Sequence, residues 1–296
     1  NDNHNVFVNA GYYSKQPFLN AVYPNNASLV GENLTNEKIT GLEAGYGFRS
    51  AIFNATLNLY YTTWKDRYQR TTDNATDNPG GYYDFSGITE VHSGVELEAN
   101  ARVTNKFKVN GMVSIGNWVY DGNSKSNRYD FENNPISGGT ATTLYLDKVK
   151  VGDAAQLTAS IGASYEVFER VILDANYRYS DHLYASIDPG RFTSATNKGT
   201  LELPSYGLMD AGFSYKMLVG KNKDRSLNFR LNVNNVLDKI YIAESRTNIF
   251  ADDFISGTSG PTYASTPGRT YNGVADANQV FFGFGRTWNF TLRYNF

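Results

Sequence analysis

The chain has 296 residues, a net charge of −2 and no cysteine. These values exclude a disulfide framework, a thiolate metal site and the clustered basic footprint of a nucleic-acid-binding protein, so nucleic acid is not an expected partner. Aromatic residues make up 15% of the chain, yet its mean hydropathy is −0.46 and no run approaches the roughly 18 apolar residues of a membrane helix.

Apolar and polar residues alternate along the first half of the chain. Val6 and Val8 share one parity with Ala10 and Tyr12, and the same period of two recurs further along. Successive side chains of a strand point to opposite faces, so each stretch predicts a strand with one apolar face. The predicted strands of this half cover residues 6–12, 42–48, 53–61, 95–101 and, with a less regular pattern, 107–118.

The second half of the chain repeats the pattern. Predicted strands cover residues 157–165, 173–179, 209–215, 227–233 and 288–296, which brings the total to about ten strands. No stretch has a convincing helical period.

The connections between these strands differ in length in a regular way. Short joins at 49–51, 104–106, 168–170 and 221–225 alternate with long polar connections at 15–36, 72–88, 121–142, 186–204 and 246–277. Short turns on one rim and long loops on the other are typical of outer-membrane barrels. A polar average hydropathy is compatible with that class, because lipid-facing and lumen-facing residues alternate.

A soluble β-sandwich is the alternative, but its apolar face would favour Ile, Val and Leu. Here Tyr and Phe concentrate near strand ends, as in the aromatic girdles of membrane barrels. The sequence therefore predicts an all-β, antiparallel transmembrane β-barrel. Its polar face is expected to line the lumen or contact a plug, with candidates Glu43, Glu96, Glu98, Arg178 and Arg230.

Three stretches resemble TonB-dependent outer-membrane receptors. "NEKITGLEAGYGFRSAIFNATLNLYYTTWKDRYQR" is similar to a hairpin of that family, "LNFRLNVNNVLDKIYI" to its penultimate-strand pattern, and "GFGRTWNFTLRYNF" to its closing strand. The long polar loops resemble receptors of the Bacteroidetes group.

The resemblance implies a barrel of about twenty-two strands filled by a plug. Residues 1–296 supply about ten of these strands and nothing that resembles the plug, so we expect them to form the carboxyl-terminal barrel portion, either as a piece of a longer receptor or as one chain of a split assembly. The implied function is TonB-coupled import of a large scarce nutrient: a siderophore, haem, cobalamin, glycan or peptide. The alternative is a structural or binding barrel, such as an adhesin or a secretion-associated protein, without active transport.

The resemblance also implies partners and a location. The barrel would lie in outer-membrane lipid and contact its own N-terminal strands and plug, with the TonB complex acting through the plug and a surface lipoprotein as a further candidate. No cofactor is implied. The barrel-assembly machinery would read the closing strand, in which one face carries Trp288, Phe290, Leu292, Tyr294 and Phe296.

Aromatic residues near the long loops are candidates for stacking on a substrate, because a flat amphipathic ring binds with little loss of entropy. The competing interpretation places each of them in the upper girdle or in packing between loops. The candidates are Trp64, Tyr68, Tyr82, Tyr83, Phe85, Trp118 and Tyr120.

Enzymatic and metal-binding interpretations are weaker. Ten-stranded omptin proteases use an Asp–His pair, but the adjacent Asp181 and His182 are expected to point to opposite faces of a strand. Asp121, Asn123 and Glu132 have the spacing of a calcium loop, whose required Gly and fifth ligand are missing. We therefore expect neither catalysis nor a metal site.

Overall fold

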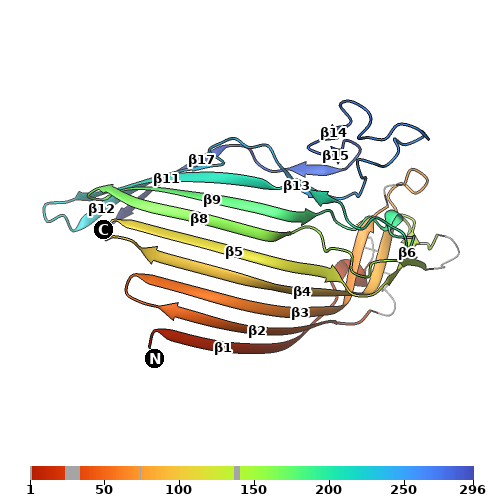
Figure 1. The fold of residues 1–296 in the computed structure, drawn as a ribbon, viewed down its shortest axis with the longest axis horizontal. Coiled ribbons are helices and arrows are strands. Elements are labelled where there is room, and N and C mark those ends of the chain that lie inside the picture. The colour runs from red at the N-terminus through yellow and green to blue at the C-terminus, as the bar shows by residue number, and fades with distance from the viewer. Residues whose placement is uncertain (1, 24–33, 74, 137–140) are drawn as a thin grey trace.

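The computed structural model describes residues 2–23, 34–73, 75–136 and 141–296. Ten strands follow one another in chain order across one antiparallel sheet (Figure 1). They are β1 His4–Lys15, β2 Glu37–Arg49, β3 Phe53–Thr72, β4 Tyr82–Arg102, β5 Phe107–Tyr120, β8 Ala155–Phe168, β9 Val171–Tyr184, β11 Tyr206–Val219, β12 Arg225–Asn234 and β17 Thr287–Asn295. Each predicted strand coincides with one of them, which confirms their number and order.

The remaining elements are short and lie toward the end of the sheet with the long connections (Figure 1). They are α1 Leu19–Val22, β6 Ser124–Tyr129, β7 Thr142–Leu144, the 3₁₀ turn η3 Pro189–Arg191, β10 Glu202–Leu203, β13 Ile242–Ser245, β14 Thr270–Tyr271, β15 Val274–Ala275 and β16 Val280–Phe282. Among the residues that the structure describes, no helix has the length and apolarity needed to cross a bilayer.

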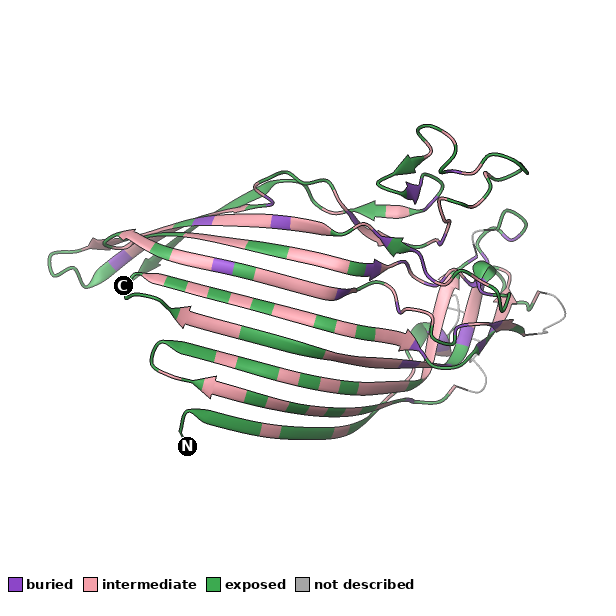
Figure 2. Cartoon of the chain, in the orientation of Figure 1, coloured by how far each residue is buried: buried purple, intermediate pink, exposed green. Residues whose placement is uncertain are grey.

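The register collects the apolar residues of different strands on one face, since directly paired residues point to the same side of a sheet. One row crosses six strands through Phe107, Tyr165, Leu173, Phe213, Leu231 and Phe290. The neighbouring row on the opposite face is polar and contains Ser164, Asp174, Gly212, Asn232 and Asn289. Exposed and partly buried residues accordingly alternate along β2 and β5 (Figure 2). This arrangement suits a wall with lipid on one side and an aqueous lumen on the other.

The short turns are stabilised by their own side chains. The Ser50 hydroxyl accepts a hydrogen bond from the backbone N–H of Phe53 (3.0 Å), and Thr104 Oγ1 accepts one from the N–H of Phe107 (3.0 Å). The other two turns use the left-handed backbone region, at Arg170 (φ 66°) and at Gly220 (φ 88°). Turn-forming polar residues and a permissive glycine thus explain why all four predicted short joins are confirmed.

The long connections contain more structure than the sequence predicted. β3 and β4 continue their ladder as far as the pair Thr72 and Tyr82, so the predicted loop at 72–88 is wrong for residues 82–88. At about 3.4 Å per residue the 20 residues of β3 extend about 68 Å, far beyond the apolar band of a membrane. β6, η3 and β10 also lie within predicted loops, and β7 begins at the last residue of one. Residues 24–33 and 137–140, within two of those connections, lie outside the described residues.

Packed apolar clusters occur beneath these connections. The first contains Phe85, Ile88, Tyr120, Leu144, Leu146, Val151, Ile187 and Phe192. The second contains Leu183, Ala185, Leu201, Leu203, Ile242 and Val274. They fix the outer connections on the strand ends, and the barrel is not closed by this chain.

Candidate functional site

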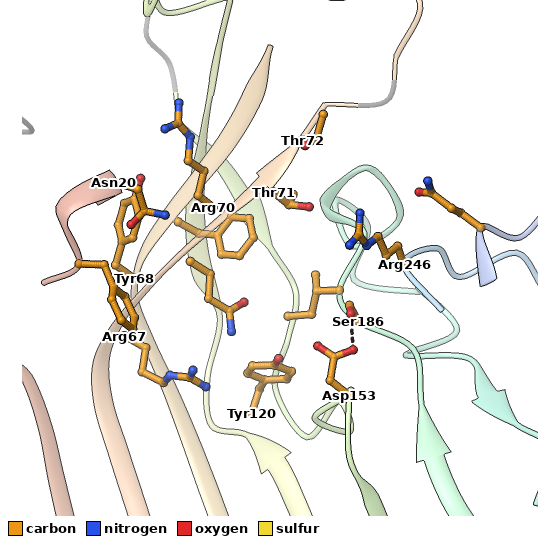
Figure 3. A pocket seen from close by; sticks show the side chains of 16 residues that line it. Asn20, Arg67, Tyr68, Arg70, Thr71, Thr72, Tyr120, Asp153, Ser186 and Arg246 are labelled. Carbon is orange, nitrogen blue, oxygen red and sulfur yellow. Dashed lines mark hydrogen bonds between the residues drawn. The ribbon is translucent and has the colours of Figure 1, made fainter. Parts of the chain in front are cut away.

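A cavity of about 650 Å³ opens where the long connections converge, and we call it the outer cavity (Figure 3). Segments from five different connections contribute to its wall. The lining residues are Phe18, Asn20, Arg67, Tyr68, Gln69, Arg70, Thr71, Thr72, Phe85, Tyr120, Gly152, Asp153, Ser186, Ile187, Arg246 and Gln279. They include three guanidinium groups and one carboxylate, so the wall is cationic and partly aromatic.

The β3 extension supplies two of the three arginines. Asp66 has a left-handed backbone (φ 57°), and the β3–β4 ladder shifts register on both sides of Arg67. These irregularities interrupt the strict alternation of side chains, which is how a β-bulge re-aims residues. Arg67, Tyr68 and Arg70 all line the cavity as a result (Figure 3).

Each cavity arginine lies over an aromatic ring. The guanidinium carbon is 4.2 Å from the Trp64 ring centroid for Arg67, and 3.3 Å from that of Tyr82 for Arg70. The corresponding distance from Arg246 to Phe281 is 4.7 Å. Stacking on a ring face orients the guanidinium plane without neutralising its charge. The rings therefore hold the arginines at the wall, where Arg67 also pairs with Glu90 and Arg246 with Glu244 (3.6 Å).

A polar network leads from the cavity floor toward the polar face of the sheet. Arg67 Nη1 donates to the carboxylate of Glu90, which is 1% exposed, and His92 Nε2 lies 3.0 Å from the other oxygen of Glu90. The imidazole of His92 stacks on Trp118 (centroids 5.2 Å apart), whose indole N–H donates to the Tyr60 hydroxyl (2.8 Å). The network links three adjacent strands beneath the cavity.

The opposite wall carries the single cavity carboxylate. The Ser186 hydroxyl donates to Asp153 Oδ1 (2.5 Å, Figure 3), and the buried Asn248 donates its amide N–H to the carbonyl of Ser186 (2.7 Å). Loss of hydration raises the pKa of Asp153, and the carboxylates of Glu244 and Glu90 raise it further. The Ser186 hydrogen bond and Arg246 act in the opposite direction.

Three of the predicted stacking residues line the cavity: Tyr68, Phe85 and Tyr120. Phe85 and Tyr120 are almost fully buried in the first apolar cluster, so they form a rigid floor. The other four have structural partners. Trp64 donates to Glu37 (2.9 Å), Tyr82 to Asn133 (2.9 Å) and Trp118 to Tyr60, while Tyr83 packs against the first cluster.

Sequence reasoning missed the cationic part of the site. Arg67 and Arg70 flank Tyr68 in "DRYQR", four residues beyond the predicted strand 53–61, and this pairing of arginine with an aromatic residue was the available signal. Asp153, Ser186 and Arg246 come from three separate connections and carried no such signal.

The five predicted lumen residues lie on one face of the sheet. Glu98 and Arg178 belong to one row through Met112 and Ser160, and the pairing of the other strands places Glu43, Glu96 and Arg230 on the same side. The two arginines are already paired, Arg178 with Asp210 (2.8 Å) and Arg230 with both oxygens of Asp174. Within the described residues, none of the three glutamates forms an ion pair.

Two groups of possible metal ligands lie in or near the outer connections. The expectation that Asp181 and His182 point apart is wrong, because His182 has a left-handed backbone (φ 50°) and the ligand atoms of Asp181, His182 and Glu202 lie within 4.8 Å of one another. In the calcium-like stretch, Asn123 Oδ1 accepts from the backbone N–H of Leu146 (3.0 Å). Asn123 Oδ1 is therefore engaged by a backbone N–H of the same connection.

A family model described as "TonB dependent receptor-like, beta-barrel" matches residues 1–236. The chain belongs to this family. Its barrel is accordingly one of the bacterial outer membrane, in a family of receptors and transporters and not of enzymes.

Relatives of this TonB-dependent receptor barrel are distant in sequence. The chain is 22% identical over 252 residues to a probable TonB-dependent siderophore receptor, PiuA, of Acinetobacter baumannii, covering 77% of this chain and 30% of that protein. The crystal structure of PiuA from the same species gives a TM-score of 0.60 at 20% identity, over 100% of this chain and 34% of that one. The copper transporter OprC gives 0.61 at 15% identity, over 99% and 37%. The receptor barrel described here thus spans about a third of the length of these relatives. None of them shows that it belongs to the Bacteroidetes group, which stays a prediction.

The family-like stretches have clear structural roles in this receptor barrel. The buried Glu37 accepts from Lys15 (3.0 Å) and from Trp64 (2.9 Å), so it joins β1, β2 and β3. In "NNVLDKIY", Asn235 has a left-handed backbone (φ 49°), and its amide donates to the carbonyls of Lys239 (2.9 Å) and Phe284 (3.2 Å). This asparagine satisfies backbone groups where β12 stops pairing with β17.

The closing strand of the receptor barrel behaves as its pattern predicts. Trp288, Phe290, Leu292 and Tyr294 pair with Val233, Leu231, Phe229 and Leu227 of β12, on the apolar face. Phe296 follows the end of β17 and is 98% exposed. Recognition of these residues by the assembly machinery stays a prediction.

Proposed function

We propose that this chain is the ligand-holding barrel portion of an outer-membrane transporter that imports a large scarce nutrient with TonB-coupled energy. The outer cavity is the observation that carries the proposal. It is large enough for a drug-sized molecule and is built from connections at the outer strand ends, resting on a packed apolar cluster. Membership of the receptor family supports the energy coupling.

The charge of the outer cavity favours an anionic ligand with flat groups. Three guanidinium groups offer several N–H donors each, and Tyr68 and Tyr120 add aromatic surface with a hydroxyl. Ferric siderophore complexes are the first candidates, because the relative PiuA is named as a siderophore receptor. Uncharged glycans and cobalamin would make poorer use of the arginines.

The polar face of the sheet is the proposed contact for the plug. Glu43, Glu96 and Glu98 form no ion pair within the described residues, whereas Arg178 and Arg230 are neutralised by neighbouring aspartates. Asn58 pairs with Glu96 across the strands, and its buried Oδ1 accepts no hydrogen bond from the part of the chain that the structure describes. This half of the wall therefore suits a basic surface on the plug, which would connect the barrel to the TonB complex.

Transport and a passive binding role are separated by an uptake experiment. The full-length receptor is expressed in cells with and without functional TonB protein, and the uptake of a panel of radiolabelled ferric siderophores is measured. Import of one complex only when TonB is functional is the expected result. Surface binding that is identical in both strains and gives no import would instead favour the structural or binding barrel.

A matched pair of variants tests the site itself. Arg246→Gln removes a cavity guanidinium that is 58% exposed and lies 3.6 Å from Glu244. Arg269→Gln removes one that pairs with Asp276 (2.6 Å) and does not line the cavity. We expect Arg246→Gln to weaken binding of the imported complex about tenfold or more, since a hydrogen bond to a charged group contributes about 1.5–3 kcal/mol. Arg269→Gln should leave the affinity unchanged. Equal affinities of both variants and the parent would place the ligand elsewhere.

A further inference from the structure

Asp181, His182 and Glu202 form a compact group of ligand atoms at the outer end of β9. Their ligand atoms all lie within 4.8 Å of one another, and His182 Nε2 is 4.0 Å from Glu202 Oε1. The group is separate from the outer cavity, because none of its three members lines that cavity. Asp181 and His182 belong to β9 and Glu202 to β10, so it joins two strands of the sheet.

The backbone at His182 creates this group. Its left-handed conformation (φ 50°) is uncommon for a residue other than glycine, and the β9 ladders skip this residue between Asp181 and Leu183. Adjacent side chains that would diverge on a regular strand are thereby directed to a common point. Glu202 reaches the same point from across the sheet, since it pairs with Tyr184.

The two carboxylates have no cationic side chain to neutralise them. In the part of the chain that the structure describes, neither Asp181 nor Glu202 forms an ion pair with lysine or arginine, and the imidazole of His182 is the nearby basic group. Asp181 is oriented by the Tyr179 hydroxyl, which donates to Oδ2 (2.8 Å), and by the N–H of His182, which donates to Oδ1 (2.8 Å). Each carboxylate oxygen keeps a further lone pair.

We propose that Asp181, His182 and Glu202 bind a divalent transition-metal ion of the Zn²⁺ type. One imidazole nitrogen and two carboxylate oxygens are a donor set for such ions, and the imidazole disfavours Ca²⁺ and Mg²⁺, which prefer oxygen ligands. Tetrahedral bonds of about 2.1 Å separate ligand atoms by about 3.4 Å. The side chains of His182 and Glu202 are about half exposed, so small rotations can close the remaining gap.

The bound ion would close a loop on the outer surface. Residues 185–201 leave the sheet after β9 and return at β10, and they contribute Ser186 and Ile187 to the outer cavity. A metal ion bound by both His182 and Glu202 would fix the two ends of the loop formed by residues 185–201. The proposal does not depend on the identity of the transported ligand.

Equilibrium dialysis with Zn²⁺, followed by metal analysis, tests the proposal on the purified full-length receptor. The parent is compared with Glu202→Gln and His182→Gln, and His4→Gln is the control because His4 is exposed and hydrogen-bonded to Tyr46, away from this group. We expect both site variants to bind one Zn²⁺ fewer per chain, or to bind it at least about tenfold more weakly, as loss of metal-site groups commonly does. The His4 variant should match the parent.

Folding of each variant is checked by the electrophoretic mobility of the unheated barrel. Glu202→Gln is conservative and exposed, so it keeps the test valid if His182→Gln does not assemble. Equal Zn²⁺ stoichiometry and affinity in the parent and Glu202→Gln would overturn the proposal. Preferential binding of Ca²⁺ over Zn²⁺ by the same residues would overturn the assigned class of metal.

Discussion

Arg67 and Glu90 form an ion pair between β3 and β4 directly beneath the outer cavity. The carboxylate of Glu90 is 1% exposed, and the guanidinium of Arg67 also lies 4.2 Å from the Trp64 ring. A buried charge without its partner is strongly unfavourable, whereas a neutral apolar pair of similar volume is tolerated. This pair therefore couples the wall of the site to the stability of the outer strands.

Removing one partner of this pair should be worse than removing both. We expect Arg67→Met to lower the free energy of unfolding by about 3–5 kcal/mol, because the buried Glu90 loses its arginine and keeps only the imidazole of His92 beside it. The double variant with Glu90→Leu should recover most of that loss. Urea unfolding of the refolded receptor in detergent gives both values, and a double variant that is less stable than Arg67→Met would contradict this account.

The raised pKa of Asp153 predicts how ligand binding changes with pH. Its folded-state pKa is raised above the ordinary value of 3.8, chiefly by loss of hydration. The ionised form is therefore disfavoured in the folded protein. Lowering the pH through the raised pKa protonates the carboxyl, which stabilises the fold relative to neutral pH and removes the one carboxylate charge among the described residues that line the cavity.

An anionic ligand should thus bind more tightly as the pH falls toward the folded-state pKa of Asp153. Asp153→Asn should bind it more tightly than the parent at pH 7 and lose most of this pH dependence. Titrations of the imported complex at several pH values above 3.8 measure both effects. Asp188, whose pKa burial also raises, is the matched control, since it does not line the cavity. Weaker binding by Asp153→Asn at pH 7 would instead make the carboxylate a direct ligand contact.

The sheet was predictable from the sequence because a membrane wall enforces alternation. Phe107, Leu173 and Phe290 share one face with lipid as their solvent, so every second residue must be apolar. Outside the membrane both faces of the sheet contact water, so every second residue no longer has to be apolar. The outer part of β4 therefore read as loop, the outer part of β3 was left outside the predicted strand, and Arg67 and Arg70 were not recognised as cavity residues.

The site depends on features that have no sequence period. The left-handed backbones of Asp66 and His182 redirect neighbouring side chains, and neither residue is a glycine that would mark the position. Asp153, Ser186 and Arg246 meet because their segments are hydrogen-bonded in the folded chain: the N–H of Asp153 donates to the carbonyl of Tyr184 (3.0 Å), and the N–H of Ser186 to that of Ser245 (2.9 Å). Such meetings follow from the tertiary arrangement, which a single sequence does not specify.

Asn235 offers a test of the break between β12 and β17. It combines a left-handed backbone (φ 49°) with side-chain hydrogen bonds to Lys239 and Phe284, and its N–H donates to Asp210 Oδ1 (2.8 Å). Asn235→Gly loses the side-chain hydrogen bonds but adopts the left-handed backbone without strain. Asn235→Ala loses the same bonds and also places a Cβ in the strained left-handed conformation. We expect Asn235→Gly to cost about 1–3 kcal/mol for the unsatisfied carbonyls, and Asn235→Ala to cost about 1 kcal/mol more. The temperature at which each variant loses the compact electrophoretic mobility of the folded barrel ranks their stabilities. Equal stability of the Asn, Gly and Ala forms would refute a stabilising role for the Asn235 side chain.

Substitution of Phe296 tests barrel assembly separately from ligand binding. It follows the last residue of β17, is 98% exposed and lies far from the outer cavity at the opposite end of the sheet (Figure 1). If the closing aromatic residues are read by the barrel-assembly machinery, Phe296→Ala should lower the amount of receptor in the outer membrane several-fold. The affinity of the receptor that does assemble should not change. Asn295→Ala, one position earlier on the polar parity, is the matched control and should assemble normally. The amount of folded receptor in isolated outer membranes and the ligand binding per folded chain distinguish these outcomes. Equal amounts of the two folded variants would exclude a special role for Phe296 in assembly. A loss of affinity that accompanies the loss of receptor would indicate a damaged barrel.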